Sequence, residues 1–305
     1  MCTTCGCSEK NDVTMTDPAT GEQQTLRKTE AVQGHSHSHD GFPPHSHDHV
    51  ASHHFSHLAH QYDRHRHHGQ GLDDSATPIT QNLSSHSTII AVEQDILAKN
   101  QQLAERNRGW FVGRGIVALN LVSSPGSGKT SLLERTLRDL NNVFSMYVVE
   151  GDQATINDAE RIRATGCPTI QINTGTGCHL DAEMLAQGLQ KLNPPPGSVV
   201  MIENVGNLVC PALFDLGEEA KVVVLSVTEG EDKPIKYPHM FRASQVMLLN
   251  KVDLLPHLRF DVGRCIAYAR QVNPAIRIFE LSAETGEGMA AWYDWLRSRV
   301  AAAQS

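Results

Sequence analysis

The stretch from Ile116 to Ser131 reads IVALNLVSSPGSGKTS, and it decides the fold. It begins with an apolar run typical of a buried strand, passes through a turn rich in Gly and Ser, and ends where a helical pattern begins. Gly128, Lys129 and Thr130 form the G-K-T of a phosphate-binding loop, the P-loop. Ser123 stands where the G-x-x-x-x-G-K-T pattern has its first Gly. The segment therefore predicts a P-loop between a strand and a helix.

Each residue type in this loop suits one task in binding a nucleotide. Glycines let backbone N–H groups approach phosphate oxygens, and the helix that follows points its positive end at them. Lys129 would reach the β and γ phosphates, and the Thr130 hydroxyl would hold Mg²⁺. The residues expected to contact the phosphates are Gly126, Ser127, Gly128, Lys129, Thr130 and Ser131.

Outward from this loop, short apolar runs alternate with helical patterns. The expected strands are IVALNLV from Ile116, MYVVE from Met146, PTIQI from Pro168, VVMIE from Val199, VVVLSV from Val222, VMLLN from Val246 and IRIFEL from Ile276. Strands that alternate with helices predict an α/β fold of the P-loop NTPase type, with a mostly parallel sheet of about seven strands flanked by helices. Ligands of such sheets bind at the carboxyl ends of the strands.

Two motifs after later strands favour a guanine nucleotide. Asn250, Lys251 and Asp253 form N-K-x-D, in which a carboxylate accepts hydrogen bonds from the guanine ring N–H and amine. Adenine has no such pair of donors, so GTP and GDP are favoured over ATP. Ser282 and Ala283 would form a second guanine loop after the last strand.

Acidic residues follow two further strands. Asp152 and Glu203 would support Mg²⁺ and position the attacking water, with Lys129 as the third residue that we expect to act in hydrolysis. Each carboxylate could instead merely cap a turn. Gly206 would follow the γ phosphate as part of a switch. Position 207 is Asn rather than a water-orienting Gln, so we expect slow unassisted hydrolysis of GTP to GDP and phosphate.

Composition excludes several classes of protein. The chain has 305 residues and a formal net charge of -8, which argues against binding to nucleic acid. No apolar run approaches the roughly 20 residues of a membrane span, and MCTTCGCSEK lacks the apolar stretch of a signal peptide. We therefore expect a cytoplasmic protein that does not contact membranes.

Residues 1–87 differ from the rest, because their apolar residues are isolated and no period persists. We expect this region to be largely disordered without metal. Thirteen of the 17 histidines lie between His35 and His68, which suits weak binding of several metal ions. Cys2, Cys5 and Cys7, with the terminal amine if Met1 is kept, suit a tight site for Ni²⁺, although Zn²⁺ also fits. A second region, 88–305, would begin with an amphipathic helix from Thr88 to Gly109 and continue as the nucleotide-binding domain.

A further metal site is indicated by Cys178, His179 and Cys210. Thiolate and imidazole bind Zn²⁺ and Ni²⁺, and Cys210 lies four residues beyond Gly206, in the expected switch segment. Taken alone, a Cys is often only a small apolar residue, and we interpret Cys167 and Cys265 in that way.

Taken together, C-x-x-C-G-C, SSPGSGKT, Cys178-His179, ENVGNLVCPA, NKVD and SAETGEG resemble the HypB family of hydrogenase maturation GTPases. The resemblance covers nearly the whole region from about Thr88. It implies GTP-dependent homodimerisation and a metal site of Cys178, His179 and Cys210 at the dimer interface. It also implies delivery of nickel to the nickel-iron hydrogenase large-subunit precursor with a HypA-type accessory protein. The histidine-rich stretch suggests nickel storage in addition.

Two alternatives remain at this point. The chain could be a related GTPase metallochaperone that serves another enzyme, such as urease, or that carries zinc. It could also be a nickel or zinc buffer in which the histidine-rich stretch is the function.

Overall fold

The computed structural model describes residues 13–17, 20–26, 36–37, 45–46, 80–152, 157–175 and 177–304. Residues 1–27 and 89–305 form one unit, and residues 28–88 form another. In the second unit, β3 (Ser36–His37) and β4 (His45–Ser46) pair as a short antiparallel ribbon, and residues 80–88 form the start of a helix. The rest of that helix and the structure that follows belong to the first unit.

A nine-stranded sheet forms the centre of the first unit, in the order β11-β10-β9-β5-β8-β6-β7-β1-β2. The strands are β1 (Thr14–Thr16), β2 (Gln23–Thr25), β5 (Val117–Ser123), β6 (Met146–Asp152), β7 (Thr169–Asn173), β8 (Val199–Glu203), β9 (Ala220–Ser226), β10 (Val246–Asn250) and β11 (Arg277–Glu280). Pairs from β5 to β11 are parallel. The expected seven strands and the mostly parallel sheet are confirmed.

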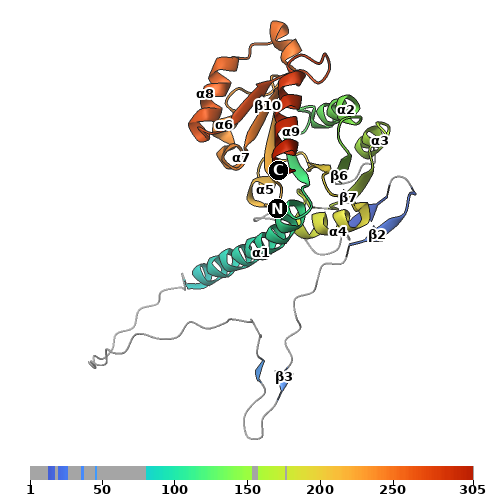
Figure 1. The fold of residues 1–305 in the computed structure, drawn as a ribbon. Coiled ribbons are helices and arrows are strands. Elements are labelled where there is room, and N and C mark those ends of the chain that lie inside the picture. The colour runs from blue at the N-terminus through green and yellow to red at the C-terminus, as the bar shows by residue number, and fades with distance from the viewer. Residues whose placement is uncertain are drawn as a thin grey trace, which may run out of the picture. The chain divides into compact units, whose positions relative to one another are not determined.

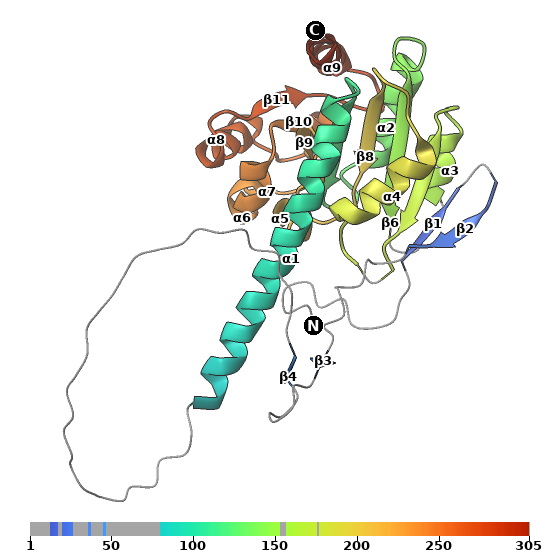
Figure 2. The ribbon, with the colours of Figure 1, turned by 60° about the horizontal axis from the view of Figure 1, so that its bottom comes forward.

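Helices cover both faces of this sheet (Figures 1 and 2). They are α1 (Thr80–Val112), α2 (Lys129–Leu140), α3 (Asn157–Arg163), α4 (Ala182–Leu192), α5 (Cys210–Leu213), α6 (Lys233–Lys236), α7 (Pro238–Ala243), the 3₁₀-helix η1 (Val252–His257), α8 (Val262–Val272) and α9 (Met289–Ala303). Side chains of α2, α3 and α9 share one apolar cluster, whereas α1 and α4 pack in a second and α7 and α8 in a third. Successive residues of β5 alternate between these clusters, as the pleat of a strand requires.

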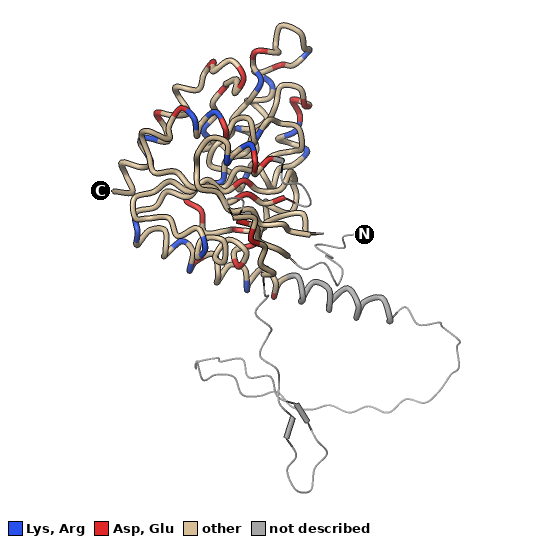
Figure 3. The backbone as a smooth tube through the Cα atoms, turned by 90° about the vertical axis from the view of Figure 1, so that its right-hand side faces the viewer, with Lys and Arg blue, Asp and Glu red and all other residues tan. Residues whose placement is uncertain are grey.

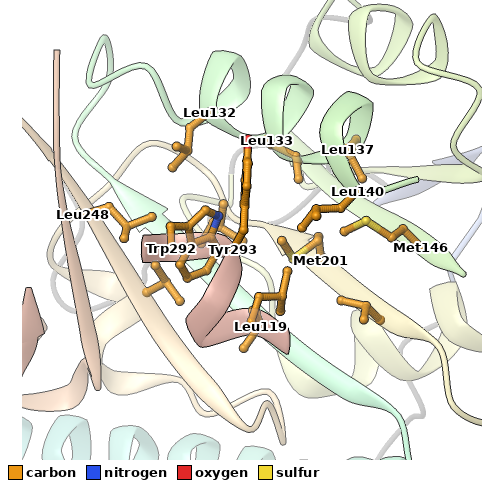
Figure 4. Close-up of a cluster of buried hydrophobic side chains, with 14 of the residues drawn as sticks. Leu119, Leu132, Leu133, Leu137, Leu140, Met146, Met201, Leu248, Trp292 and Tyr293 are labelled. Carbon is orange, nitrogen blue, oxygen red and sulfur yellow. The ribbon is translucent and has the colours of Figure 1, made fainter. Parts of the chain in front are cut away.

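The first cluster holds the P-loop helix in place. Helices α2 and α9 pack together on side chains of the sheet (Figure 4). The residues involved are Leu132, Leu133, Leu137 and Leu140 of α2 and Trp292 and Tyr293 of α9. The Trp292 Nε1–H donates to Thr136 Oγ1 at 3.1 Å, so its one polar atom is satisfied inside the cluster. Burial of this leucine stripe fixes the direction in which α2 leaves the P-loop.

Helix α1 begins at Thr80, eight residues before the expected start, and its packing differs from the expected apolar face. The side chain of Ile96 is 45% exposed. The buried stripe is instead Asn100, Ala104, Asn107 and Phe111, which recur at helical spacing. Asn107 Nδ2 donates to the carbonyls of Ala182 at 2.9 Å and Leu216 at 3.0 Å. Polar side chains join the described part of this helix to the domain because backbone groups of α4 and the following loops need partners there.

Part of the N-terminal region belongs to the sheet, which the sequence pattern did not indicate. Strand β1 pairs with β7 in antiparallel fashion, and β2 pairs with β1 as the outer edge. Met15 is 3% exposed and packs in the second cluster beside Ile172. The expected boundary at residue 87 therefore divides residues that pack together, because residues 13–26 lie with the nucleotide-binding domain.

Acidic and basic residues are interspersed along the described backbone (Figure 3). Within the described residues, no helix combines the length and the apolar character that crossing a membrane would require.

Candidate nucleotide and metal site

The P-loop takes the expected form between β5 and α2. Gly126 and Gly128 have φ values of 78° and 87°, in the left-handed region that favours glycine. A Cβ on Gly128 would lie 2.6 Å from Asn250 Nδ2, so the loop also needs glycine there for space. Helix α2 begins at Lys129, which aims its N-terminus at the loop. The missing first Gly is tolerated because Ser123 is the last residue of β5 and lies in the sheet.

A cavity of about 550 Å³ opens above this loop at the carboxyl ends of the strands. It is lined by Ser123 to Ser131, Glu150 to Asp152, Asp158, Arg161, Glu203 to Gly206 and Lys251. The volume suits a nucleotide-sized ligand. The predicted phosphate-contacting residues and the two predicted carboxylates, Asp152 and Glu203, therefore line one cavity.

Glu203 is the centre of the phosphate end of this cavity. Its Oε1 accepts hydrogen bonds from Lys129 Nζ and from Thr130 Oγ1, both at 2.6 Å. The residue is only 1% exposed, and its Oε2 is buried without a hydrogen-bond partner. A buried carboxylate needs compensation, which Lys129 provides here. Carboxylate and hydroxyl oxygens side by side fit Mg²⁺, which prefers oxygen ligands.

Glu150 is a second buried acid beside Glu203, and the sequence analysis assigned it no role. Burial, together with the charges of Glu203 and Asp152, raises the pKa of its carboxyl to about 9, against a smaller opposing effect of Lys129. The sequence feature that could have identified Glu150 as a site residue was its position near the end of β6. Glu150 therefore holds a proton near neutral pH and adds no negative charge to the cavity.

The two guanine motifs meet at one side chain. Asn250 Nδ2 donates to the Ser127 carbonyl at 3.0 Å, and Asn250 Oδ1 accepts from the Ala283 N–H at 3.1 Å. Asn250 thereby joins the P-loop to the loop of Ser282 and Ala283. This arrangement brings together three segments that lie far apart in the sequence.

Lys251 and Asp253 are the other two residues of the predicted base-binding motif, and of the two Lys251 lines the cavity. Lys251 has a φ of 65°, and its Nζ donates to the Gly126 carbonyl at 2.7 Å, which lays its stem along the P-loop. Asp253 Oδ1 is buried without a hydrogen-bond partner. A buried carboxylate oxygen without a donor is costly, so this atom is suited to receive N–H donors from a bound base.

Cys178, His179 and Cys210, here called the triad, come together in space. Their ligand atoms all lie within 4.8 Å of one another, and no other such group occurs among the described residues. Cys178 Sγ is 3.7 Å from His179 Nδ1. His179 is 8% exposed, and the centroid of its ring lies 4.0 Å from that of the Phe214 ring, a contact that holds the orientation of the imidazole. Two sulfurs and one imidazole nitrogen are a donor set for Zn²⁺ or Ni²⁺ with one position open.

The remaining cysteines divide into two groups. Burial raises the thiol pKa of Cys167 and of Cys265 to about 12, which keeps both protonated and unsuited to metal binding. Cys2, Cys5 and Cys7 lie outside the described residues.

Asn204 connects the triad loop with the phosphate end, and the sequence analysis gave it no separate role. It follows Glu203 directly and is fully buried. Its Oδ1 accepts from the N–H groups of Leu180 at 3.1 Å and Val205 at 3.0 Å. Leu180, next to His179, also packs so closely on Gly151 that a Cβ there would lie 2.6 Å from Leu180 Cγ. The triad loop thus rests on the ends of both acid-bearing strands, β6 and β8.

Residues 117–280 match the protein family described as "CobW/HypB/UreG, nucleotide-binding domain". The chain is 53% identical over 310 residues to the hydrogenase maturation factor HypB of Rhizobium leguminosarum bv. viciae, covering 99% of this chain and 97% of that protein. Among solved structures, HypB from Archaeoglobus fulgidus has a TM-score of 0.63 and 41% identity, over 67% of this chain and 99% of that one. HypB from Helicobacter pylori, solved in complex with nickel, has a TM-score of 0.62 and 36% identity, over 66% of this chain and 95% of that one.

Proposed function

Since this chain belongs to the HypB hydrogenase maturation factors, within the CobW/HypB/UreG family, we propose that it hydrolyses GTP and delivers Ni²⁺ to the nickel-iron hydrogenase large-subunit precursor. The observation that carries the proposal is the connection from Lys129 and Thr130 through Glu203 and Asn204 to the triad. The HypB structure from H. pylori with nickel supports nickel as the cargo. Zn²⁺ fits the same donors, so the donor set alone does not select the metal. Nickel as the delivered metal is therefore part of the proposal.

In the proposed reaction, GTP lies in the cavity of about 550 Å³ with its base at Asp253 and its phosphates on the P-loop. Lys129 would exchange its buried partner Glu203 for the β and γ phosphates. Thr130, Asp152 and Glu203 would hold Mg²⁺, which would neutralise phosphate charge when bound. Asn207 follows Gly206 in place of a water-orienting Gln, so the proposed hydrolysis is slow without a partner.

The exchange of partners at Lys129 explains how binding of nucleotide could change the affinity of the triad for metal. Glu203 Oε1 loses a charged partner when Lys129 turns to phosphate, so the end of β8 must adjust. Asn204 is the next residue and holds the Leu180 N–H beside His179. A tenfold change in metal affinity between nucleotide states needs only about 1.4 kcal/mol of coupling, about the size of one hydrogen bond.

Nickel affinity in defined nucleotide states tests this coupling. The chain without the histidine-rich residues 35–68, and with Cys2, Cys5 and Cys7 replaced by Ser, reports on the triad alone. Its nickel affinity is measured in GDP and in a non-hydrolysable GTP analogue with Mg²⁺. We expect about one Ni²⁺ per chain, with affinities that differ about tenfold between the states. Cys178→Ser should abolish this binding, whereas Cys265→Ser, at a buried thiol, should keep it. Equal affinities in both states would refute nucleotide control.

Delivery itself is tested by maturation of hydrogenase in cells. Lys129→Ala should leave nickel binding at the N-terminal cysteines intact and abolish maturation, because the phosphates lose their cation. A fully matured hydrogenase in that variant would refute the GTPase-driven proposal.

We further propose that delivery involves a GTP-dependent homodimer, a HypA-type accessory protein and a cytoplasmic setting, as the family membership suggests. The histidine-rich stretch between His35 and His68 is proposed to store nickel. Deleting residues 35–68 should leave maturation intact when nickel is ample. Loss of maturation under those conditions would favour the alternative of a buffering protein.

A further inference from the structure

The β1–β2 hairpin, residues 13–17 and 20–26, covers the β7 edge of the sheet and has no part in the proposed nucleotide chemistry. Its attachment is substantial for so short a segment. Met15 and Leu26 pack in the second cluster, which also contains Ile172 and Leu185. The Leu26 N–H donates to the Val13 carbonyl at 2.8 Å and closes the hairpin at its base. The described residues that follow the N-terminal cysteines are therefore fastened to the domain.

The direction of β1 decides where the preceding residues leave the sheet. Thr14 pairs with Asn173 and Thr16 with Gln171, so β1 runs against β7. The N-terminal end of β1 thus lies at the carboxyl end of β7, and the chain from β7 leads directly to Cys178 and His179. A parallel β1 would have placed the preceding residues at the opposite edge. The segment that contains Cys7 is attached at the edge where the triad lies.

The number of residues on either side of the β1–β7 pair sets an upper limit on the distance between Cys7 and Cys178. Cys7 precedes Thr14 by seven residues and Cys178 follows Asn173 by five. At up to about 3.5 Å per residue, seven residues reach about 24 Å and five reach about 18 Å. Paired strand residues are separated by about 5 Å between Cα atoms, so Thr14 lies at most about 23 Å from Cys178. Cys7 therefore has enough chain to reach Cys178, whatever path the loop takes.

The loop from β7 to Cys178 is folded back on itself, which shortens the distance between Asn173 and Cys178. Thr174 Oγ1 donates to the Gly177 carbonyl at 2.7 Å, and the Gly177 N–H donates to the Thr174 carbonyl at 2.8 Å. Cys178 is half-buried, so its thiol remains partly accessible.

We propose that the β1–β2 hairpin is a tether that lets Ni²⁺ pass within one chain between the N-terminal cysteines and the triad, with Cys7 as the nearest donor. The proposal rests on the proposed function in one respect, namely that the triad binds nickel. Transfer proceeds by exchange of ligands. Cys178 or Cys210 loses its thiol proton to water as its sulfur binds Ni²⁺, the departing thiolate takes up a proton, and nickel stays divalent.

Tethering matters because it shortens the connection between the two sites, which would otherwise run through residues 28–88. A short flexible connection gives an effective concentration on the order of millimolar. Transfer within the chain should then outpace transfer between chains at micromolar protein. Its rate should also be independent of protein concentration.

Cross-linking tests the proximity without metal or nucleotide. In the full chain with Cys2, Cys5 and Cys210 replaced by Ser, Cys7 and Cys178 are the reactive thiols, because the raised pKa values of Cys167 and Cys265 keep those buried thiols protonated. A short bismaleimide should join Cys7 to Cys178 within one chain, with a yield independent of protein concentration. Met15→Asp should lower the yield about tenfold, since a charge in the apolar cluster detaches the hairpin. Gln24→Asp, on the exposed strand β2, is the matched control and should change nothing.

Nickel transfer is then followed in chains with all native cysteines, loaded with one Ni²⁺ each, by the nickel–thiolate absorption. We expect rates independent of protein concentration in both chains, and a rate about tenfold lower in Met15→Asp, because the longer connection lowers the effective concentration. Met15→Ala is the milder substitution if Met15→Asp does not fold, and it should give a smaller decrease. A concentration-dependent rate in the native chain, or equal cross-linking in Met15→Asp and Gln24→Asp, would overturn the tether. Absence of Ni²⁺ from the isolated triad would instead overturn the proposed function.

Discussion

At the scale of single residues, one carboxylate oxygen links the nucleotide and metal chemistries. Glu203 Oε1 accepts from both Lys129 and Thr130, while Oε2 is buried without a partner. The P-loop cation is therefore engaged before any phosphate arrives. Under the proposed function, binding of nucleotide would be an exchange of partners at Glu203 rather than the filling of an inert pocket.

Asp253 should determine the choice of base. Asp253→Asn replaces a carboxylate acceptor by an amide, whose NH₂ group faces the guanine amine, so GTP affinity should fall by about 10- to 100-fold. Xanthosine triphosphate, which has a carbonyl in place of that amine, should bind the variant better than the native chain. Fluorescence titration with labelled nucleotides measures both. Asp294→Asn, at an exposed carboxylate of α9, serves as the control. Unchanged discrimination between the two bases would show that Asp253 does not contact the base.

Glu150 should make the free protein less stable as pH rises. Its folded pKa of about 9 lies above the ordinary 4.5, so the folded state retains a proton that the unfolded state releases between these values. Each pH unit in that window lowers the free energy of unfolding by up to about 1.4 kcal/mol. Glu150→Gln cannot release a proton and should be similar in stability to the native chain at pH 5 but more stable at pH 8.5.

Urea unfolding without nucleotide or metal, at several pH values, measures this difference. Glu284→Gln, at an exposed carboxyl, should follow the native pH profile. Parallel profiles for Glu150→Gln and the native chain would mean that Glu150 is ionised in the folded state.

At the scale of elements, the ends of β6 and β8 support the triad loop that follows β7. Strand β6 provides Gly151, against which Leu180 packs, and β8 ends next to Asn204, which holds the Leu180 N–H. Because β6 lies between β7 and β8 in the sheet, three successive strand ends form one connected edge. Under the proposed function, movement of β8 at the phosphates would therefore change the position of His179.

Asn204→Ala should uncouple the two sites. It leaves the Leu180 and Val205 N–H groups without their acceptor, while Lys129, Thr130 and Glu203 remain. We expect GTP affinity to stay within about threefold and the tenfold nucleotide dependence of nickel affinity to disappear. Isothermal titration with Ni²⁺ in both nucleotide states measures this. Asn142→Ala, exposed in the turn before β6, should retain the full dependence. Persistence of the dependence in Asn204→Ala would place the connection elsewhere.

At the scale of the whole molecule, the N-terminal region contributes to two units. Residues 1–27 belong with the nucleotide-binding domain, and residues 28–88 form the other unit. Strand β1 and Met15 fill a position at the β7 edge that would otherwise expose apolar side chains of the second cluster. A cut at residue 87 would thus remove sheet and core as well as the histidine-rich stretch.

Two deletions separate these contributions. Removing residues 28–79 should leave the thermal midpoint within a few degrees of the native value, because both the hairpin and α1 remain. Removing residues 1–87 should lower stability by about 2–4 kcal/mol, through lost burial of Met15 and Leu26. Thermal unfolding by circular dichroism, with GDP present throughout, compares the two. Equal stability would mean that the hairpin contributes nothing to the fold.

The sequence by itself determined the parallel sheet, the P-loop and the base-selecting motifs. Long apolar runs and motif residues are local signals, and parallel strands bring residues after strand ends to one edge whatever the details of packing. The same reasoning predicted the carboxylates of Asp152 and Glu203, which line the cavity, and the triad residues, whose ligand atoms lie close together.

Only the tertiary structure decided the rest. Strands β1 and β2 have three residues each, too few for a period to be visible, and the pairing of β1 with β7 spans more than 150 residues of sequence. Asn100 and Asn107 look like surface residues until the backbone groups that they bind are in place. The raised pKa of Glu150 and the bond from Asn204 to Leu180 likewise depend on neighbours from other strands. Burial and long-range hydrogen bonding are properties of the assembled fold, so no local pattern could reveal them.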